Sequence, residues 1–203
     1  MSAKIIAIEG LDGAGKSTCV RELSRKIKME HGYTVKAIKF ALFTKEHKRY
    51  NNIIKCYVPD DSSIYAFLTS GIAFVEGLCQ FEEHLLPNLR RYDIILVERY
   101  KVGLICLLKY YKAPQIKDMI KILDSFPEPD VTLLFDLPIQ VAVNRLIKKG
   151  EKLPPWYGNY LKQISYFLHE TLQEQNHAII DAATSYENIV ESCLENILLE
   201  VQR

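Results

Sequence analysis

The chain has 203 residues, of which 48% are hydrophobic and 25% are charged. This composition excludes a disordered or fibrous protein and fits one globular domain, which we expect to extend over residues 1–203. The 26 basic and 25 acidic residues leave a net charge of +1. Because the chain lacks a broad positive field, we expect no nucleic acid partner, and any anionic ligand must be held locally.

Cysteine spacing and hydropathy indicate a cytoplasmic protein. The five cysteines form an odd set in which no two lie within four residues of each other, so neither a zinc site nor a disulfide framework is predicted. No stretch approaches the ~18 uninterrupted apolar residues of a membrane span, and the N-terminus shows no basic-then-apolar signal region. We therefore expect reduced thiols and no membrane partner.

Short apolar runs predict five β-strands: Lys4–Ile8, Thr34–Phe40, Asp93–Val97, Val131–Phe135 and His177–Ile180. Most of these runs are continuous in Ile, Val and Leu, which is typical of strands that are covered on both faces of a sheet. Such strands need helices above and below them.

Helical periodicity fills the stretches between the strands. The first helix carries an apolar face over Val20–Ile27 and ends near Gly32. Further helices are predicted over about Ser63–Arg90, Gly103–Tyr111, Gln115–Asp124, Ile139–Lys149, Trp156–Gln175 and Tyr186–Val201, and Pro87 should kink or stop the first of these six. The alternation predicts an α/β fold, a three-layer sandwich with a five-stranded, mostly parallel sheet. Ligands of such sheets bind beyond the carboxyl ends of the strands.

A phosphate-binding pattern follows the first predicted strand. Gly10–Ser17 reads Gly, four residues, Gly-Lys-Ser, in which glycines let backbone N–H groups turn around a phosphate at a helix N-terminus. Lys16 can reach the β- and γ-phosphates, and the Ser17 hydroxyl can bind Mg²⁺. The residues expected to bind ATP are Gly10, Asp12, Gly13, Ala14, Gly15, Lys16, Ser17 and Thr18.

An acid-arginine pair follows the third predicted strand, where Glu98-Arg99-Tyr100 stands. Glu98 could hold Mg²⁺ or take an acceptor proton, and Arg99 could clamp a phosphate through its planar fork. An isolated Glu-Arg pair is more often an ordinary surface ion pair. The carboxyl end of a strand beside a phosphate loop favours the functional interpretation.

Four motifs in order resemble those of the thymidylate kinase family of nucleoside monophosphate kinases. Glu9–Thr18 is similar to the family's phosphate loop, and Glu98–Tyr100 is similar to its Asp-Arg-Tyr/Trp motif. Phe135–Pro138, leading a helix with Arg145, resembles its Leu-Asp-x-Pro stretch, and Ile180–Ala182 resembles its closing Ile-Asp-Ala. The resemblance extends over residues 4–201.

The resemblance implies a P-loop NTPase fold and an ATP- and Mg²⁺-dependent transfer of the γ-phosphoryl group to a nucleoside monophosphate, with dTMP as the best candidate. It implies a lid over residues 145–158, with catalytic roles for Lys16, Glu98, Arg99 and Arg145. Lys45 and Arg99 would hold the acceptor phosphate, and Tyr100 would press on its sugar. Phe74 is a candidate to stack on the acceptor ring, although core packing is the more common role of such a residue.

The resemblance leaves a homodimer open. Family members often form dimers through helices beside the third-strand motif, and the apolar run Val102–Leu108 fits such a surface. The same run fits a buried helix equally well.

The acceptor end departs from the family pattern. Thr44-Lys45-Glu46-His47 stands where the family has Thr-Arg-Glu-Pro, and no arginine stands near Glu76-Gly77, where one would read the thymine edge. Cys106, Leu107 and Leu108 replace polar groups that help to hold the base. A deoxynucleoside kinase, another small-metabolite kinase and a non-catalytic nucleotide-binding protein therefore stay open as alternatives, and the chain has no guanine-binding Asn/Thr-Lys-x-Asp motif.

Overall fold

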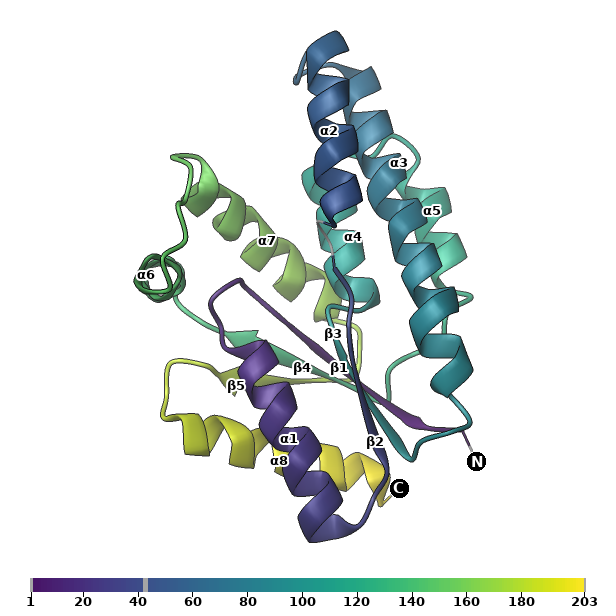
Figure 1. Ribbon diagram of the computed structural model, residues 1–203, viewed down its shortest axis with the longest axis vertical. Helices are drawn as coiled ribbons and strands as arrows, with labels where there is room; N and C mark the ends of the chain where they lie inside the picture. The colour runs from purple at the N-terminus through teal and green to yellow at the C-terminus, as the bar shows by residue number, and fades with distance from the viewer. Residues whose placement is uncertain (1, 42–43, 203) are drawn as a thin grey trace.

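A computed structural model describes residues 2–41 and 44–202, in which five strands form one parallel sheet (Figure 1). The strands are β1 Lys4–Gly10, β2 Val35–Lys39, β3 Ile94–Glu98, β4 Val131–Asp136 and β5 His177–Asp181. Their order is β2-β3-β1-β4-β5, and every neighbouring pair is parallel. The five predicted strands and the α/β class are confirmed.

The sheet register brings the carboxyl ends of the inner strands together. Glu98, the last residue of β3, lies opposite Ile8 of β1 and opposite Lys39 of β2. Gly10, the last residue of β1, lies opposite Phe135 of β4. The phosphate loop and the acid-arginine pair therefore start from the same edge.

Helices cover both faces of the sheet (Figure 1). On one face lie α1 Lys16–His31 and α8 Tyr186–Val201, and on the other lie α3 Ser63–Gln80, α4 Lys101–Tyr110, α5 Ile116–Leu123 and α7 Tyr157–Leu172. The remaining helices are α2 Lys45–Tyr57, which packs on α3, and α6 Ile139–Lys148, which leads to α7. The sequence did not predict α2, which begins where Thr44 accepts a hydrogen bond from the His47 amide at 2.9 Å.

Helix α3 changes form before Pro87. A π-helical turn at Phe81–Leu85 and a 3-10 turn at Leu86–Asn88 continue it. By length and composition, Ser63–Asn88 could cross a membrane, because an 18-residue window within it has a mean hydropathy of 1.4. In this structure α3 packs against α2 and α4, so we interpret it as a packing helix of the fold.

Helix α4 lies in the middle of the molecule. All of Val102–Leu108 is buried, because α4 is enclosed by α3, α7 and the sheet. This run, which also fitted a surface for a second copy, is a core helix.

Candidate active site

The phosphate loop between β1 and α1 depends on its glycines. Gly10 and Gly13 have φ values of +136° and +84°, which side-chain-bearing residues rarely adopt. A Cβ on Gly10 would lie 2.6 Å from the Phe135 carbonyl oxygen, and one on Gly13 would lie 2.8 Å from the Ala142 carbonyl oxygen. The loop therefore packs closely on β4 and α6 with its backbone.

Lys16 points into the curve of this loop. Its ammonium donates to the carbonyl oxygens of Gly10 at 2.8 Å and Leu11 at 2.7 Å. The side chain is buried, and burial lowers its pKa from the usual 10.5 to about 8. Folding thus places the Lys16 ammonium, whose burial costs free energy, at the position where a phosphate would be bound.

Ser17 and Glu98, the two predicted Mg²⁺ ligands, are in contact. The Ser17 hydroxyl lies 2.7 Å from Glu98 Oε2. Lys39 completes the group, with its Nζ 3.1 Å from Glu98 Oε1 and 2.9 Å from Ser17 Oγ. A hydroxyl and a carboxylate are hard oxygen donors that suit Mg²⁺ when substrate phosphates and water supply the remaining ligands.

Arg99 lies beside the loop in an uncommon conformation. Its φ is +63°, a left-handed value that costs a non-glycine residue about 1 kcal/mol or more. Its guanidinium pairs with Asp12, whose other carboxylate oxygen accepts a hydrogen bond from the Tyr157 hydroxyl at 2.6 Å. The cluster joins β3, the phosphate loop and α7.

Glu9 fixes the turn that carries Arg99, a role that the sequence did not reveal. Its buried carboxylate accepts from the backbone N–H groups of Tyr100 at 2.7 Å and Gly103 at 3.1 Å. Burial raises the pKa of this carboxyl group. Glu9 therefore ties the end of β1 to the start of α4.

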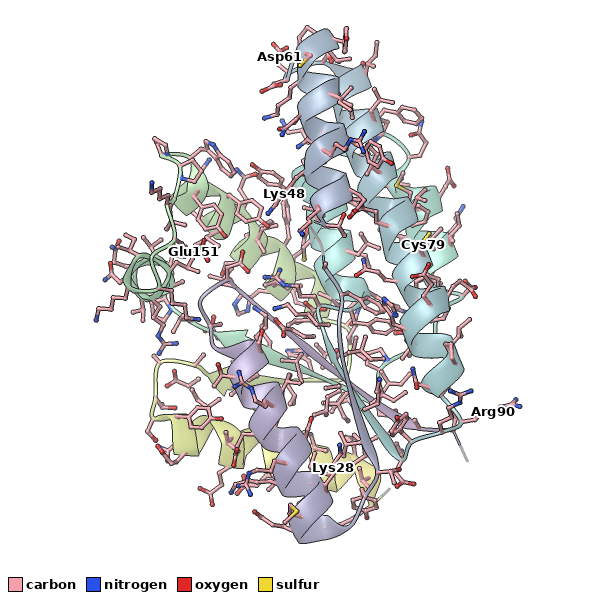
Figure 2. The ribbon with its side chains drawn as sticks, in the orientation of Figure 1. Lys28, Lys48, Asp61, Cys79, Arg90 and Glu151 are labelled. Carbon is pink, nitrogen blue, oxygen red and sulfur yellow. The ribbon has the colours of Figure 1, made fainter. Side chains whose placement is uncertain are left out.

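One large cavity of about 980 Å³ opens beside these groups. Of the sequence candidates, those that line it are Asp12, Gly13, Gly15, Lys16, Ser17, Thr18, Glu98 and Arg99. Gly10 and Ala14 do not line it. The cavity continues to α2 and to the segment after α6, where Lys48 and Glu151 stand on opposite sides of the opening (Figure 2).

The expected lid region borders the cavity. Lys149 and Lys152 line it, whereas Arg145 does not and has its Nη1 3.5 Å from the Gly13 carbonyl oxygen. The segment between α6 and α7 thus brings cations to the phosphate loop.

Three acceptor candidates lie away from this cavity and need correction. Phe74 packs in the hydrophobic core with Phe40 and Tyr100. Tyr100 is itself 2% exposed and donates its hydroxyl to the Pro127 carbonyl oxygen at 3.0 Å. Lys45 is exposed in the first turn of α2 and does not line the cavity, whereas Lys48, one turn later, does.

Comparison with known proteins decides the family, because the model of the thymidylate kinase family matches residues 8–193. The chain belongs to the thymidylate kinase family. A probable thymidylate kinase of Archaeoglobus fulgidus is 27% identical over 189 residues, covering 92% of this chain and 91% of that protein. A thymidylate kinase of Pseudomonas putida is 26% identical over 198 residues, covering 93% and 92%.

As a thymidylate kinase family member, the protein is a phosphotransferase of the nucleoside monophosphate kinase type. Its phosphate loop, oxygen donors and arginine converge on one cavity. This arrangement can neutralise and align two phosphate groups, which is what phosphoryl transfer requires of a protein.

Proposed function

We propose that this protein transfers the γ-phosphoryl group of ATP to the phosphate of dTMP, forming dTDP and ADP in the cytoplasm. The observation that carries the proposal is the convergence of the phosphate loop, the Ser17–Glu98 pair and Arg99 on one cavity. Membership of the thymidylate kinase family supports the choice of acceptor.

The donor side of this site is the phosphate loop. Backbone N–H groups at the start of α1 would surround the phosphates of ATP, and Lys16 would neutralise the γ-phosphate. Ser17 and Glu98 would hold Mg²⁺, which supplies positive charge to the phosphate oxygens. Lys39 neutralises Glu98 from the other side.

The acceptor side centres on Arg99. Its planar guanidinium would bind the acceptor phosphate, and Asp12 and Tyr157 hold that guanidinium in place. An oxygen of the acceptor phosphate attacks the γ-phosphorus in line. The bond from that phosphorus to the β–γ bridging oxygen breaks, and ADP leaves with the electron pair. No covalent intermediate with the protein is required.

The lid is the third part of the proposal. Lys149 and Lys152 face the cavity, and Arg145 contacts the loop carbonyl of Gly13. Cations placed there would stabilise the charge that spreads over the oxygens of the transferring group. The segment that carries them would also exclude water during transfer.

Release of ADP in the presence of ATP, Mg²⁺ and dTMP tests the function. We expect ADP and dTDP in equal amounts and no ADP without an acceptor. Arg99→Lys keeps the charge but loses the planar fork, so kcat/KM for dTMP should fall about 100-fold. Arg90→Lys is the matched control, because Arg90 lies exposed at the far end of the molecule (Figure 2). Absence of dTMP-dependent ADP release would refute the proposal.

A further inference from the structure

A continuous row of tyrosine rings forms one side of the cavity. Tyr110 is the last residue of α4, Tyr111 follows it directly, and Tyr157 and Tyr160 lie in the first turn of α7; we call these four residues the tyrosine wall. Ring centroids are 5.6 Å apart for Tyr110 and Tyr111, 4.9 Å for Tyr110 and Tyr160, and 5.4 Å for Tyr157 and Tyr160. The wall exists because α4 and α7 pack side by side (Figure 1).

The wall starts beside the group proposed to hold the acceptor phosphate. The Tyr157 hydroxyl bonds to Asp12, and Asp12 pairs with Arg99. A ring joined through a sugar to a phosphate on Arg99 would therefore lie near the tyrosine faces. Lys48 and Lys112 border the same cavity farther along.

Several hydrogen-bonding groups around the wall are already engaged within the protein. The Tyr157 hydroxyl donates to Asp12, and the Tyr65 hydroxyl donates to Asn51 Oδ1 at 3.0 Å. The Tyr111 hydroxyl lies 3.4 Å from His47 Nε2. Tyr160 is buried and packs edge-on against Tyr110, whereas Tyr110, Tyr111 and Tyr157 are partly exposed. These three side chains consequently offer ring faces to a ligand more than groups that would read the edge of one base.

A second space next to Arg99, lined by described residues, is too small for a base. It measures about 10 Å³ and is lined by Tyr100, Gly77 and Leu104 among others. Leu104 fills it, since a Cβ on Gly77 would lie 2.5 Å from Leu104 Cδ2. Phe74, the stacking candidate from the sequence, lies in the core.

We propose that the acceptor base stacks on the tyrosine wall, and that the site therefore phosphorylates several nucleoside monophosphates, dTMP among them. This inference rests on the proposed kinase activity and deepens it. Aromatic faces stack on every base, whereas strong discrimination requires buried hydrogen bonds matched to one base. The absence of an arginine near Glu76-Gly77 agrees with a site of this kind.

Acceptor kinetics test the breadth of the site. With saturating ATP and Mg²⁺, we expect kcat/KM for dTMP, dUMP, dCMP and dGMP to fall within about tenfold of one another. A preference for dTMP above about 100-fold over all others would overturn the inference while leaving the kinase activity standing. Turnover with none of them would refute the proposed function.

Nucleotide binding can be measured without turnover. Trp156 is the only tryptophan of the chain, and its ring lies 5.9 Å from that of Tyr157 and 6.3 Å from that of Tyr160. Titration of its fluorescence with each nucleotide should give similar dissociation constants for all four. Saturable quenching by dTMP alone would contradict the inference even if catalysis were absent.

Variants of Tyr110 locate the stacking. Tyr110→Leu should raise the KM of every acceptor by about tenfold and leave the KM of ATP unchanged. Tyr110→Phe retains the ring and should restore most of the affinity. Tyr166→Leu is the matched control, because Tyr166 lies on α7, 64% exposed, and does not line the cavity. An equal rise in the KM of ATP, or no rise for any acceptor, would overturn the inference.

Discussion

Replacement of Lys16 by methionine should separate activity from stability. The lysine is 4% exposed, and burial lowers its pKa from 10.5 to about 8. At ~1.4 kcal/mol per pKa unit, this shift corresponds to a cost on the order of 3 kcal/mol for keeping the ammonium charged in the folded state at pH 7. Lys16→Met removes the charge at similar volume. Two loop carbonyls lose their donor, but they border a cavity open to water.

The expected result is a more stable and nearly inactive protein. The free energy of unfolding at pH 7 should rise by about 1–2 kcal/mol once the loss of the donor to the two carbonyl groups is subtracted. The rate of phosphoryl transfer should fall about 1000-fold, since a donor to a transferring group contributes ~3–4 kcal/mol to the transition state.

The pH dependence supplies the sharper test. A lysine whose pKa is lowered on folding makes the folded state more stable as pH rises from 8 towards 10.5, because the unfolded chain then binds more protons. The advantage of Lys16→Met should therefore shrink over this range. Urea unfolding followed by circular dichroism at pH 7.0, 8.5 and 9.5 measures it. A variant that is less stable than the parent at pH 7, or a difference that does not change with pH, would refute the reasoning.

Three further outcomes are expected. Millimolar ATP with Mg²⁺ should raise Tm by about 5–10 °C, because the ligands bind only the folded state; no shift in differential scanning fluorimetry would contradict a nucleotide site. Glu98→Gln should raise the Mg²⁺ concentration for half-maximal activity about tenfold, and an unchanged Mg²⁺ titration would remove Glu98 from the metal site. Burial lowers the pKa of His47, so the folded state should lose stability as pH falls below 6.5 towards that lower value, where the unfolded chain takes up the proton first. His47→Asn should flatten urea midpoints between pH 7 and 5, and an identical slope in both proteins would exclude this cause.

The sequence predicted the sheet well because its strands are buried on both faces. Short continuous runs of Ile, Val and Leu are typical of strands that lie between two layers of helices, and the five predicted strands match the structure to within about two residues at each end. The phosphate loop was equally visible, since its glycines and Lys16 must stand at fixed spacing in one short segment. Short sequence patterns of this kind can be identified from the amino-acid sequence alone.

Groups joined across the fold were not predictable in the same way. Lys39 reaches Glu98 only because β2 pairs with β3 in a register that sets these two residues opposite each other. The expected role of Tyr100 assumed that the residue after the acid-arginine pair faces a ligand, and that of Phe74 assumed that its ring stacks on the acceptor, but both side chains lie in the core. The tyrosine wall depends on how α4 and α7 pack against each other, and no sequence motif predicts that packing.

The burial of α4 also affects which helices can unfold locally while the rest of the protein stays folded. This helix is held to β1 through Glu9, which accepts from the backbone of Tyr100 and Gly103, and it contacts both α3 and α7. Amide hydrogens of α4 should therefore exchange with solvent only when the whole domain unfolds, whereas those of α2, where His47 is the only buried residue, should exchange through local opening. At the acceptor end of the cavity, α2 can therefore open locally, whereas α4 opens only when the core unfolds.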